Sequence, residues 1–450
     1  MGMRKIPPRG LPLGFLLTVM TVMAGALGAP APTAADDAAR PRFLTLAEAV
    51  DHHVVAERVA GVPAAERALA ALRLEGSEVA QAILRVLDGR GRHVRPVWAA
   101  RGVCVDLTDE ELTRLLAEYP TLQAETIDQL AEPIMPWPRP GPSGPTMAPP
   151  APNAWNLAMS GATALLQERG LTGQGVLIGV VGPDLPYLHP CLSGKIKHSK
   201  HFGDPKANTG TVEDLMLMHP LGVLAGFVKG RFQGVATGAV LSLATVTRGK
   251  LPTAELLAAI EWVLQPTDDP PPAAILLCVD FGGPAPKAVR QILAACRTAG
   301  VLPIIPAGNI PSRITGMAAL PECLTIGALD QWKAKAGFSG TGPGVVEAVP
   351  IPKPDWAEPG VAIYGPNLEG SYRFGSGTLQ AAAHFAGIWA QMREARPADD
   401  LETLLEALAT SAIDLGAPGF DMETGRGLPN PSAALWHLEN PPPPPAESWP

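Results

Sequence analysis

The spacing of apolar residues changes several times along the first third of the chain. Between residues 42 and 131 a repeat of about 3.6 residues alternates with a repeat of about two, which are the periods of a helix and of a strand. The pattern predicts helices over residues 44–59 and 64–87 and strands over residues 94–99, 102–107 and 121–127. Thr108 and Glu111 predict a capping box at the start of a further helix before the last strand. Residues 42–131 are therefore expected to form a small α+β module.

Predicted strands alternate with predicted helices over residues 154–438. The strands expected at residues 176–181 and 301–306 are apolar throughout, whereas the helices expected at residues 254–264 and 286–299 are apolar on one side. Such alternation is typical of a parallel sheet with helices on both faces. The expected fold class is therefore α/β, a doubly wound parallel sheet preceded by the small α+β module.

A proline-rich stretch, EPIMPWPRPGPSGPTMAPPAPN, separates these two parts. Proline lacks the backbone N–H that helix interiors and central strands need, so residues 132–153 are expected to be a linker without either. The domain plan is then a signal segment, the module, the linker, a larger domain and a proline-rich tail. Their bounds are residues 1–28, 42–131, 132–153, 154–438 and 439–450.

The first 28 residues have the order of a secretory signal. Three basic residues precede an apolar run over residues 11–23, which is followed by the small-residue pattern A-L-G at residues 26–28. This order predicts export, to a secreted or cell-envelope location. The alternative is an uncleaved N-terminal anchor, because residues 11–28 are barely long enough to span a bilayer. No other integral membrane span is expected.

Composition narrows the set of partners and cofactors. The net charge is −8 over 450 residues without a block of Lys or Arg, which argues against a nucleic-acid partner. Five cysteines form no C-x-x-C pattern and allow at most two disulfides: Cys104, Cys191, Cys278, Cys296 and Cys323. The pairs His52-His53 and His198/His201 lack Cys, Asp or Glu partners at ligand spacing. No metal site and no cofactor is therefore expected.

The most informative motif lies at residues 374–387, FGSGTLQAAAHFAG. Its part G-T-L-Q-A-A-A-H-F-A-G resembles the G-T-S-M-A-S-P-H-V-A-G stretch around the nucleophilic serine of subtilisin-like serine peptidases, the subtilases. Leu379 stands at the serine position. The resemblance runs in order from residue 155 to residue 435, with further anchors at residues 234–246 and 320–330. It implies the subtilase fold.

Other functional positions of the family can be placed by the same resemblance. Residues 176–182 resemble the family's first buried strand, which ends on the catalytic aspartate and here ends on Gly182. His219 stands at the position of the catalytic histidine, and Asn309, in A-G-N, at that of the asparagine that donates to the oxyanion. Residues 274–283 resemble one wall of the substrate cleft, which would be lined by Asp280, Phe281, Gly282 and Gly283.

Peptide hydrolysis in this family needs a hydroxyl nucleophile, an imidazole, a carboxylate that orients the imidazole, and an oxyanion donor. Leu379 supplies no nucleophile and Gly182 supplies no carboxylate. In subtilisin, loss of the nucleophile lowers kcat by about 10⁶, so Asn309 alone would support only a background rate. The resemblance therefore implies a subtilase that has lost proteolysis and binds peptide or protein in the former substrate cleft.

Two alternatives stay open at this point. Ser376 and Asp184 lie two or three residues from the lost positions, and a shifted loop could bring both toward His219, giving an active serine endopeptidase with relocated residues. Alternatively, the module at residues 42–131 resembles a subtilase propeptide, so the chain could be a structural scaffold whose cleft is filled in cis by its own N-terminal module. A carboxylate at Asp280 would favour a cationic peptide, unless it is simply the exposed end of a strand. A structural calcium ion is compatible with the resemblance, but the sequence places no site for one.

Overall fold

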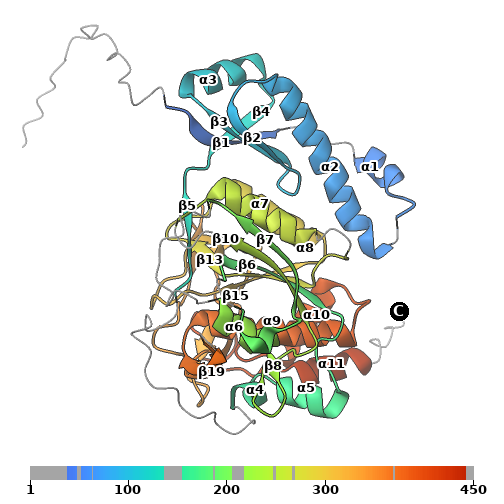
Figure 1. Ribbon diagram of the computed structural model, residues 1–450, viewed down its shortest axis with the longest axis vertical. Coiled ribbons are helices and arrows are strands. Elements are labelled where there is room, and N and C mark those ends of the chain that lie inside the picture. The colour runs from blue at the N-terminus through green and yellow to red at the C-terminus, as the bar shows by residue number, and fades with distance from the viewer. Residues whose placement is uncertain are drawn as a thin grey trace, which may run out of the picture.

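A parallel sheet of seven strands lies at the centre of the larger part of the computed structural model (Figure 1). Its strand order is β18-β15-β14-β12-β6-β10-β7, and every neighbouring pair is parallel. The strands are β6 (Leu177–Pro183), β7 (Ile196–Phe202), β10 (Val240–Val246), β12 (Ala274–Leu277), β14 (Leu302–Pro306), β15 (Leu324–Leu329) and β18 (Trp356–Pro359). The expected α/β fold class is confirmed.

The structure describes residues 38–47, 52–62, 64–135, 155–185, 188–204, 217–246, 250–265, 269–367 and 370–441. The predicted signal segment, residues 136–153 of the predicted linker and most of the tail lie outside these ranges. Within them, no helix is both long enough and apolar enough to cross a bilayer.

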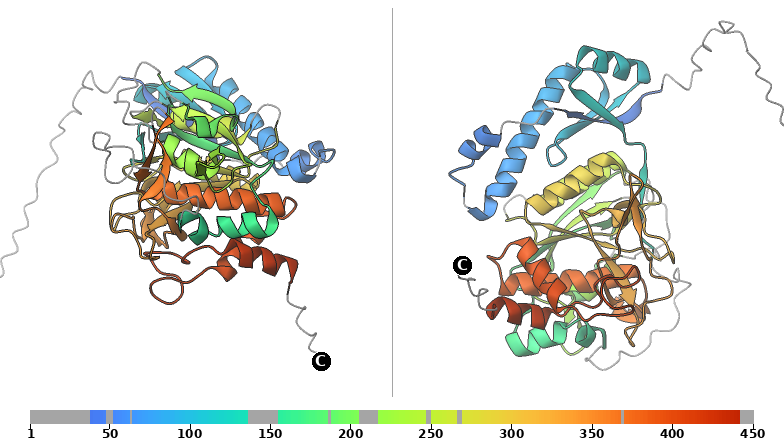
Figure 2. Two further views of the ribbon diagram at one scale, coloured as in Figure 1. Left: turned by 60° about the horizontal axis from the view of Figure 1, so that its bottom comes forward. Right: turned by 180° about the vertical axis from the view of Figure 1, so that it is seen from behind.

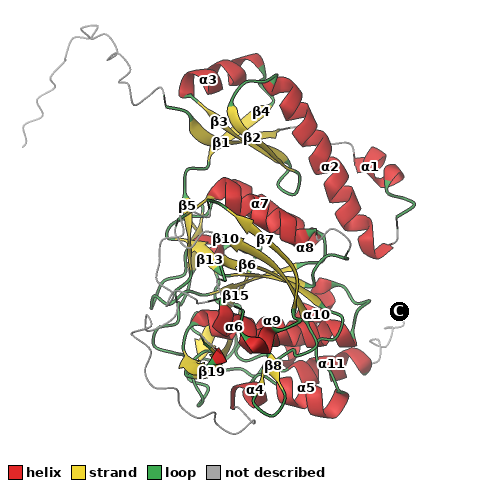
Figure 3. Ribbon diagram, viewed as in Figure 1, coloured by secondary structure: helices red, strands yellow, loops and turns green. Residues whose placement is uncertain are grey.

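Helices cover both faces of the seven-stranded sheet (Figure 3). α7 (Thr253–Leu264) contacts β6 and β10, and α8 (Lys287–Thr298) contacts β14 on the same face. α9 (Thr378–Ala395) contacts β12, β14, β15 and β18 from the other face, and residues 378–392 are all buried. Within β6, Val181 packs on the side of α7 while Ile178 and Val180 pack on the side of α9. Because alternate side chains point to opposite faces, a strand covered on both sides must be apolar throughout.

Shorter elements complete the larger part. They are α4 (Trp155–Met159), α5 (Ala162–Arg169), α6 (Met218–Ala225), α10 (Leu401–Ser411), α11 (Pro431–Glu439), the 3₁₀ helices η1 (Pro190–Leu192) and η4 (Gly316–Ala319), and the hairpins β8 (Phe227–Val228) with β9 (Phe232–Gln233), β16 (Gly344–Val346) with β17 (Val349–Ile351), and β19 (Ile363–Pro366) with β20 (Tyr372–Gly375). Of these, α6 and the β19–β20 hairpin position the candidate site.

A four-stranded antiparallel sheet with helices forms the N-terminal module, which lies over α7 in Figure 1 and in the right-hand view of Figure 2. Its elements are β1 (Arg40–Leu46), α1 (His52–Arg58), α2 (Ala64–Leu87), β2 (Arg92–Val97), β3 (Gly102–Leu107), α3 (Asp109–Glu118) and β4 (Leu122–Thr126). The predicted capping box is confirmed: Thr108 Oγ1 accepts from the Glu111 N–H at 3.1 Å, and the Glu111 carboxylate accepts from the Thr108 N–H at 2.8 Å. Local side-chain chemistry was enough to place this helix start.

The helix predicted over residues 44–59 is wrong. Residues 40–46 form β1, which pairs with β3 on one side and β4 on the other, and only His52–Arg58 are helical. Phe43 and Leu44 are 2% and 0% exposed in the middle of that sheet. The strands that pair with β1 on its two edges are far away in sequence, and this pairing outweighs the helical spacing of a short stretch of apolar residues.

The expectation that residues 132–153 contain no central strand is also wrong at its start. β5 (Leu130–Pro133) is the middle strand of a three-stranded antiparallel sheet, between β11 (Leu251–Pro252) and β13 (Val279–Phe281). Pro133 lies opposite Val279, whereas the next residue, Ile134, donates its N–H to the Cys278 carbonyl at 2.9 Å. Antiparallel pairs alternate between bonded and non-bonded positions, so a proline at the non-bonded position costs no ladder hydrogen bond.

Candidate functional site

The N-terminus of α9 is held by Asn309, the residue expected to donate to an oxyanion. Asn309 Oδ1 accepts from the backbone N–H of Thr378 at 2.9 Å and from its hydroxyl at 3.0 Å. Its Nδ2 donates to the carbonyl oxygen of Met135. A helix N-terminus carries N–H groups without intrahelical partners, and Asn309 satisfies one of them from a neighbouring loop. The amide that would face an oxyanion is bonded to the chain's own backbone.

Leu379, at the expected nucleophile position, is the second residue of α9. Its side chain is 3% exposed and belongs to the same hydrophobic core as Leu217 and Ile363. A branched hydrocarbon has no atom that can attack a carbonyl carbon. At this position the helix contributes packing rather than a reactive group.

His219 lies on α6 and is 3% exposed. Its Nε2–H donates to the Ile363 carbonyl at 3.1 Å, and its Nδ1 accepts from the Gln380 side-chain amide at 3.4 Å. Burial, and then the nearby charge of Arg373, lower the pKa of His219 to about 4. The imidazole is therefore neutral at pH 7, with the Nε2–H tautomer, and both ring nitrogens are occupied.

The β19–β20 hairpin lies directly on the imidazole of His219. A Cβ added at Gly365 or Gly375 would come within 2.7 Å or 2.9 Å of His219 Nε2, so the absence of side chains at these two positions permits the contact. Tyr364 and Tyr372 stack on each other within the same hairpin, with ring centroids 5.4 Å apart. The hairpin therefore packs closely against the edge of the imidazole that carries Nε2.

Gly182, at the expected aspartate position, ends β6 in an apolar environment. It pairs with Thr245 of β10, and a Cβ placed on it would lie 3.0 Å from both Cys278 Cβ and Leu217 Cδ1. Those two side chains fill the space next to Gly182, so an aspartate side chain at this position would require them to move. At the position of the family's aspartate, the chain therefore has both a glycine and apolar neighbouring side chains.

Ser376 and Asp184 do not replace the missing groups in this arrangement. Ser376 Oγ accepts from the Ala362 backbone N–H at 2.9 Å, and the Asp184 backbone N–H donates to the Val246 carbonyl at 3.0 Å. Both ring nitrogens of His219 are bonded to other groups. The structure thus brings together His219, Leu379 and the Gly182 strand, and it keeps the two substitute candidates in backbone contacts of their own.

Residues 130–135 run beside β13, the strand that the sequence predicts as a wall of the cleft. Their strand β5 pairs with the cleft wall β13 on one edge and with β11 on the other, and Ala131 at its centre is 0% exposed. The Thr253 hydroxyl donates to the Gln129 carbonyl at 2.7 Å just before the strand, and Asn309 holds the Met135 carbonyl at its end. The chain thus places its own segment along residues 278–281 of the expected wall.

The carboxylate of Asp280, on the expected cleft wall, is bonded to backbone N–H groups. Asp280 Oδ1 accepts the N–H groups of Met317 at 2.6 Å and of Phe281 at 2.7 Å. A Cβ at Gly316, whose φ is +64°, would come within 2.2 Å of that oxygen. Burial raises the pKa of Asp280 to about 7 despite these bonds. The carboxylate therefore ties the wall to the η4 turn.

A cavity of about 550 Å³ lies beside the cleft strand. Its walls come from Ile134 and Met135 of the strand and from Phe281, Gly282 and Ile310 of the larger part. The Arg313 guanidinium, at its rim, donates to the Gly282 carbonyl at 2.7 Å. Gly283, by contrast, follows the wall with open space around its Cα.

Polar contacts dock the module on α7 and α8. Both carboxylate oxygens of Glu125 accept from the first backbone N–H groups of α8, at Lys287 (2.7 Å) and Ala288 (3.0 Å). Arg95 of β2 pairs with Glu255 of α7 at 2.8 Å. A carboxylate at a helix N-terminus gains both hydrogen bonds and a favourable interaction with the helix dipole. The module and the larger part are therefore joined at several points besides the cleft strand.

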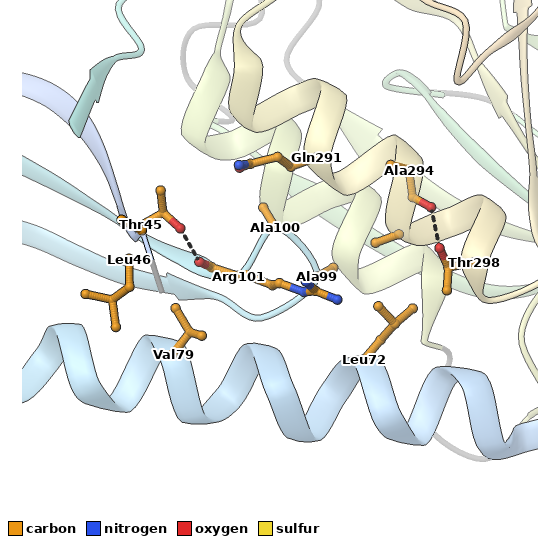
Figure 4. A pocket seen from close by; sticks show the side chains of 12 residues that line it. Thr45, Leu46, Leu72, Val79, Ala99, Ala100, Arg101, Gln291, Ala294 and Thr298 are labelled. Carbon is orange, nitrogen blue, oxygen red and sulfur yellow. Dashed lines mark hydrogen bonds between the residues drawn. The ribbon is translucent and has the colours of Figure 1, made fainter. Parts of the chain in front are cut away.

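A second cavity, of about 390 Å³, lies between α2, the β2–β3 connection and α8 (Figure 4). Leu46, Leu72 and Val79 are among its apolar lining residues. The hydroxyls of Thr45 and Thr298 each donate to a backbone carbonyl at 3.0 Å, so they have partners already. This cavity is a gap in the module interface with few groups to orient a ligand.

No candidate metal centre emerges from the described residues. They contain no group of three or more His, Cys, Asp or Glu side chains placed to hold an ion. His198 pairs with Asp269 at 2.6 Å, while the side chains of His52 and His53 lie outside the description. All five cysteines are described, and each is a free, buried thiol.

One residue and one segment that sequence reasoning missed shape the site. Gln380, directly after Leu379, donates to His219, and the available signal was a polar residue where the family motif has methionine. The segment is β5, which was not predicted as a strand because it contains Pro133. His384, in contrast, is a buried part of the core, bonded to Asn156 and to the Gln380 carbonyl, each at 2.8 Å.

Comparisons with known proteins agree with this architecture. The Subtilase family (Peptidase_S8) model matches residues 173–427. The chain is 26% identical over 293 residues to the subtilisin-like protease PopC of Myxococcus xanthus, which covers 59% of this chain and 61% of PopC. It is 26% identical over 285 residues to the M-protease of Shouchella clausii, covering 62% of this chain and 69% of that protein.

The fold has a counterpart among solved structures. The chain is similar to fervidolysin from Fervidobacterium pennivorans, a keratinolytic enzyme related to subtilisin, with a TM-score of 0.61 and 17% identity, covering 90% of this chain and 62% of that one. Identity this low supports the fold alone, and the chain spans about three fifths of PopC and of fervidolysin. The family model nevertheless covers residues 173–427, which are more than half of the chain. The chain belongs to the subtilase family.

Proposed function

We propose that this chain is an exported subtilase without peptidase activity, whose cleft holds an extended peptide strand. The proposal depends mainly on the residue that stands at the family's nucleophile position. Leu379 stands there, buried, and His219 Nε2, the nitrogen that would receive a proton, donates to the Ile363 carbonyl instead. The N-terminal sequence supports export.

The cleft retains what peptide binding needs. An added strand gains affinity from main-chain hydrogen bonds along a sheet edge, and side-chain pockets set its specificity. The pairing of β5 with β11 and β13 supports this mode of binding, with residues 130–135 as the occupant in the resting protein. A strand tethered in cis has an effective concentration of about millimolar, so a peptide in trans competes well only when the strand is released.

An active peptidase with relocated residues is less well supported. Ser376, Asp184 and His219 would need new partners and a movement of the β19–β20 hairpin before a proton could pass between them. A permanent scaffold is the limiting case of our proposal, in which the cleft strand never leaves.

Releasing the cleft strand tests the proposal. Ala131→Arg should prevent docking of β5, because residue 131 is 0% exposed between two strands, whereas Leu130→Arg is the matched control at a position that is 40% exposed. We expect a fluorescent peptide of sequence LAEPIM to bind Ala131→Arg at least about tenfold more tightly than wild type or Leu130→Arg, since the competing cis strand is gone. Fluorescence polarisation measures the three affinities.

Two results would contradict the proposal. If the peptide bound none of the proteins while circular dichroism showed each of them folded, the permanent scaffold would replace the peptide-binding function. If the peptide were cleaved by Ala131→Arg, the chain would be an active peptidase held closed by its own strand.

A further inference from the structure

Glu261, on α7, lies beneath the connection between β2 and β3 of the module. Its Oε2 accepts the backbone N–H of Ala99 at 3.0 Å. A cavity of about 550 Å³ adjoins it, with Trp98 on the module side and Trp262 on the domain side. The carboxyl group is therefore half-buried between surfaces that meet only when the module is docked.

Several charged groups face Glu261 from the elements around it. On the module side these are Arg73 of α2, Arg95 of β2 and the thiol of Cys104 of β3; on the domain side they are Glu255 of α7 and Lys200 with His201 of β7, which line the same cavity. Most cations among them have other contacts. Arg73 lies over the Trp98 ring at 5.8 Å, Lys200 over the Phe202 ring at 5.1 Å, and Arg95 pairs with Glu255 at 2.8 Å.

We propose that docking of the N-terminal module takes up one proton at Glu261, so that the module holds the cleft more firmly in acid than in alkali. The proton comes from solvent and converts the carboxylate to the carboxylic acid. Oε2 can keep accepting the Ala99 N–H in both forms, because protonation at Oε1 leaves its lone pairs in place. The docked geometry therefore survives protonation and gains from removal of a partly buried charge.

The acidity of Glu261 in the docked state supports this direction. Burial is the largest influence and raises its pKa from 4.5 to about 7, against the hydrogen bonds from Ala99 and Trp98 and the charges of Arg73 and Arg95. When the pKa of an acid is raised on docking, the equilibrium constant for docking is highest below the undocked pKa, here about pH 4.5. It then falls by up to about tenfold per pH unit until the pH reaches the docked pKa of about 7. Between pH 5 and pH 8 we expect the equilibrium constant for docking to fall by a factor between about ten and about a hundred.

This proton uptake would regulate access to the cleft, a consequence that rests on the proposed peptide-binding function. β5 follows the module directly in sequence, so release of the module also removes the support for the strand. Peptide binding in trans should then increase as the pH rises. The docking equilibrium itself can be measured without any peptide.

Hydrogen exchange of the full chain tests the proposal through the segment 98–101, which contains the Ala99 N–H. Wild type, Glu261→Gln and Glu255→Gln are compared between pH 5 and pH 8, with rates corrected for intrinsic exchange. Glutamine has the same shape and keeps an acceptor for Ala99 but cannot ionise. Glu255→Gln is the matched control on the same helix, since it weakens the pair with Arg95 without removing the proton site.

We expect the protection of this segment to fall at least about tenfold with pH in wild type and in Glu255→Gln, and to change by less than about threefold in Glu261→Gln. A flat wild-type profile would overturn the proposal, and so would an unchanged slope in Glu261→Gln, which would move the proton to another group such as His201. Binding of the LAEPIM peptide is followed in the same samples. If protection changes with pH but the peptide never binds, the proposed function fails while the proton-coupled docking stands.

Discussion

Replacing Lys353 by methionine is expected to lower the free energy of unfolding by about 3 kcal/mol. The Lys353 ammonium is buried, at 1% exposure, and donates to the Cys323 carbonyl at 2.6 Å and to Asp355 Oδ2 at 2.7 Å. Asp355 Oδ2 also accepts the Thr325 N–H at 2.7 Å, so the pair joins the starts of β15 and β18. Methionine fills the same volume but leaves a carboxylate and a carbonyl without their donor.

Urea unfolding of three variants checks this expectation. Lys353→Met combined with Asp355→Asn should recover part of the loss, because the uncompensated charge is removed. Lys229→Met is the exposed control and should change stability by less than about 0.5 kcal/mol. A cost below about 1 kcal/mol for Lys353→Met would mean that this ion pair is not a structural element of the sheet.

Replacing His219 by alanine is expected to destabilise the protein by about 2–4 kcal/mol. The change creates a cavity under the β19–β20 hairpin and leaves the Ile363 carbonyl and the Gln380 amide without partners. Loss of a histidine that serves catalysis is often neutral or stabilising, because catalytic sites are strained for activity rather than for stability. The sign of the effect therefore separates a structural histidine from a catalytic one.

The pH dependence of stability gives the same test a second readout. Because the pKa of His219 falls from 6.5 to about 4 on folding, its contribution is complete above about pH 6.5 and is lost as the pH falls toward 4. His384, whose pKa burial also lowers to about 4, adds a similar loss. Wild type should lose stability over this window more steeply than His219→Ala in urea titrations at pH 7 and pH 5. Equal slopes, or a more stable variant, would contradict the structural role of His219.

Local chemistry explains what could be predicted from the sequence. The capping box at Thr108, the apolar strand at residues 176–181 and the motif around Leu379 each depend on neighbouring residues, and all three appear in the structure at the expected places. The leucine at the position of the family's serine can be read directly from this motif, at residue 379. The fold class follows from the alternation of strands and helices.

Contacts between distant segments explain what could not be predicted. β1 is a strand because β3 and β4 pair with it. β5 is a strand because β11 and β13 pair with it, and both lie more than a hundred residues further along the chain. Lys353, between two prolines, carried no signal that its ammonium would be buried against Asp355. The orientation of His219 toward Ile363 likewise depends on the β19–β20 hairpin, which lies 144 residues further along the chain.

The absence of a peptidase nucleophile is tested most directly by intact-mass spectrometry after the full chain reacts with a fluorophosphonate. Leu379 offers no hydroxyl, and Ser376 is hydrogen-bonded to the Ala362 backbone with no general base engaged. We expect an unchanged mass under conditions that label an active subtilase completely. One adduct per chain, mapped to Ser376, would contradict the loss of activity and establish the relocated peptidase in its place.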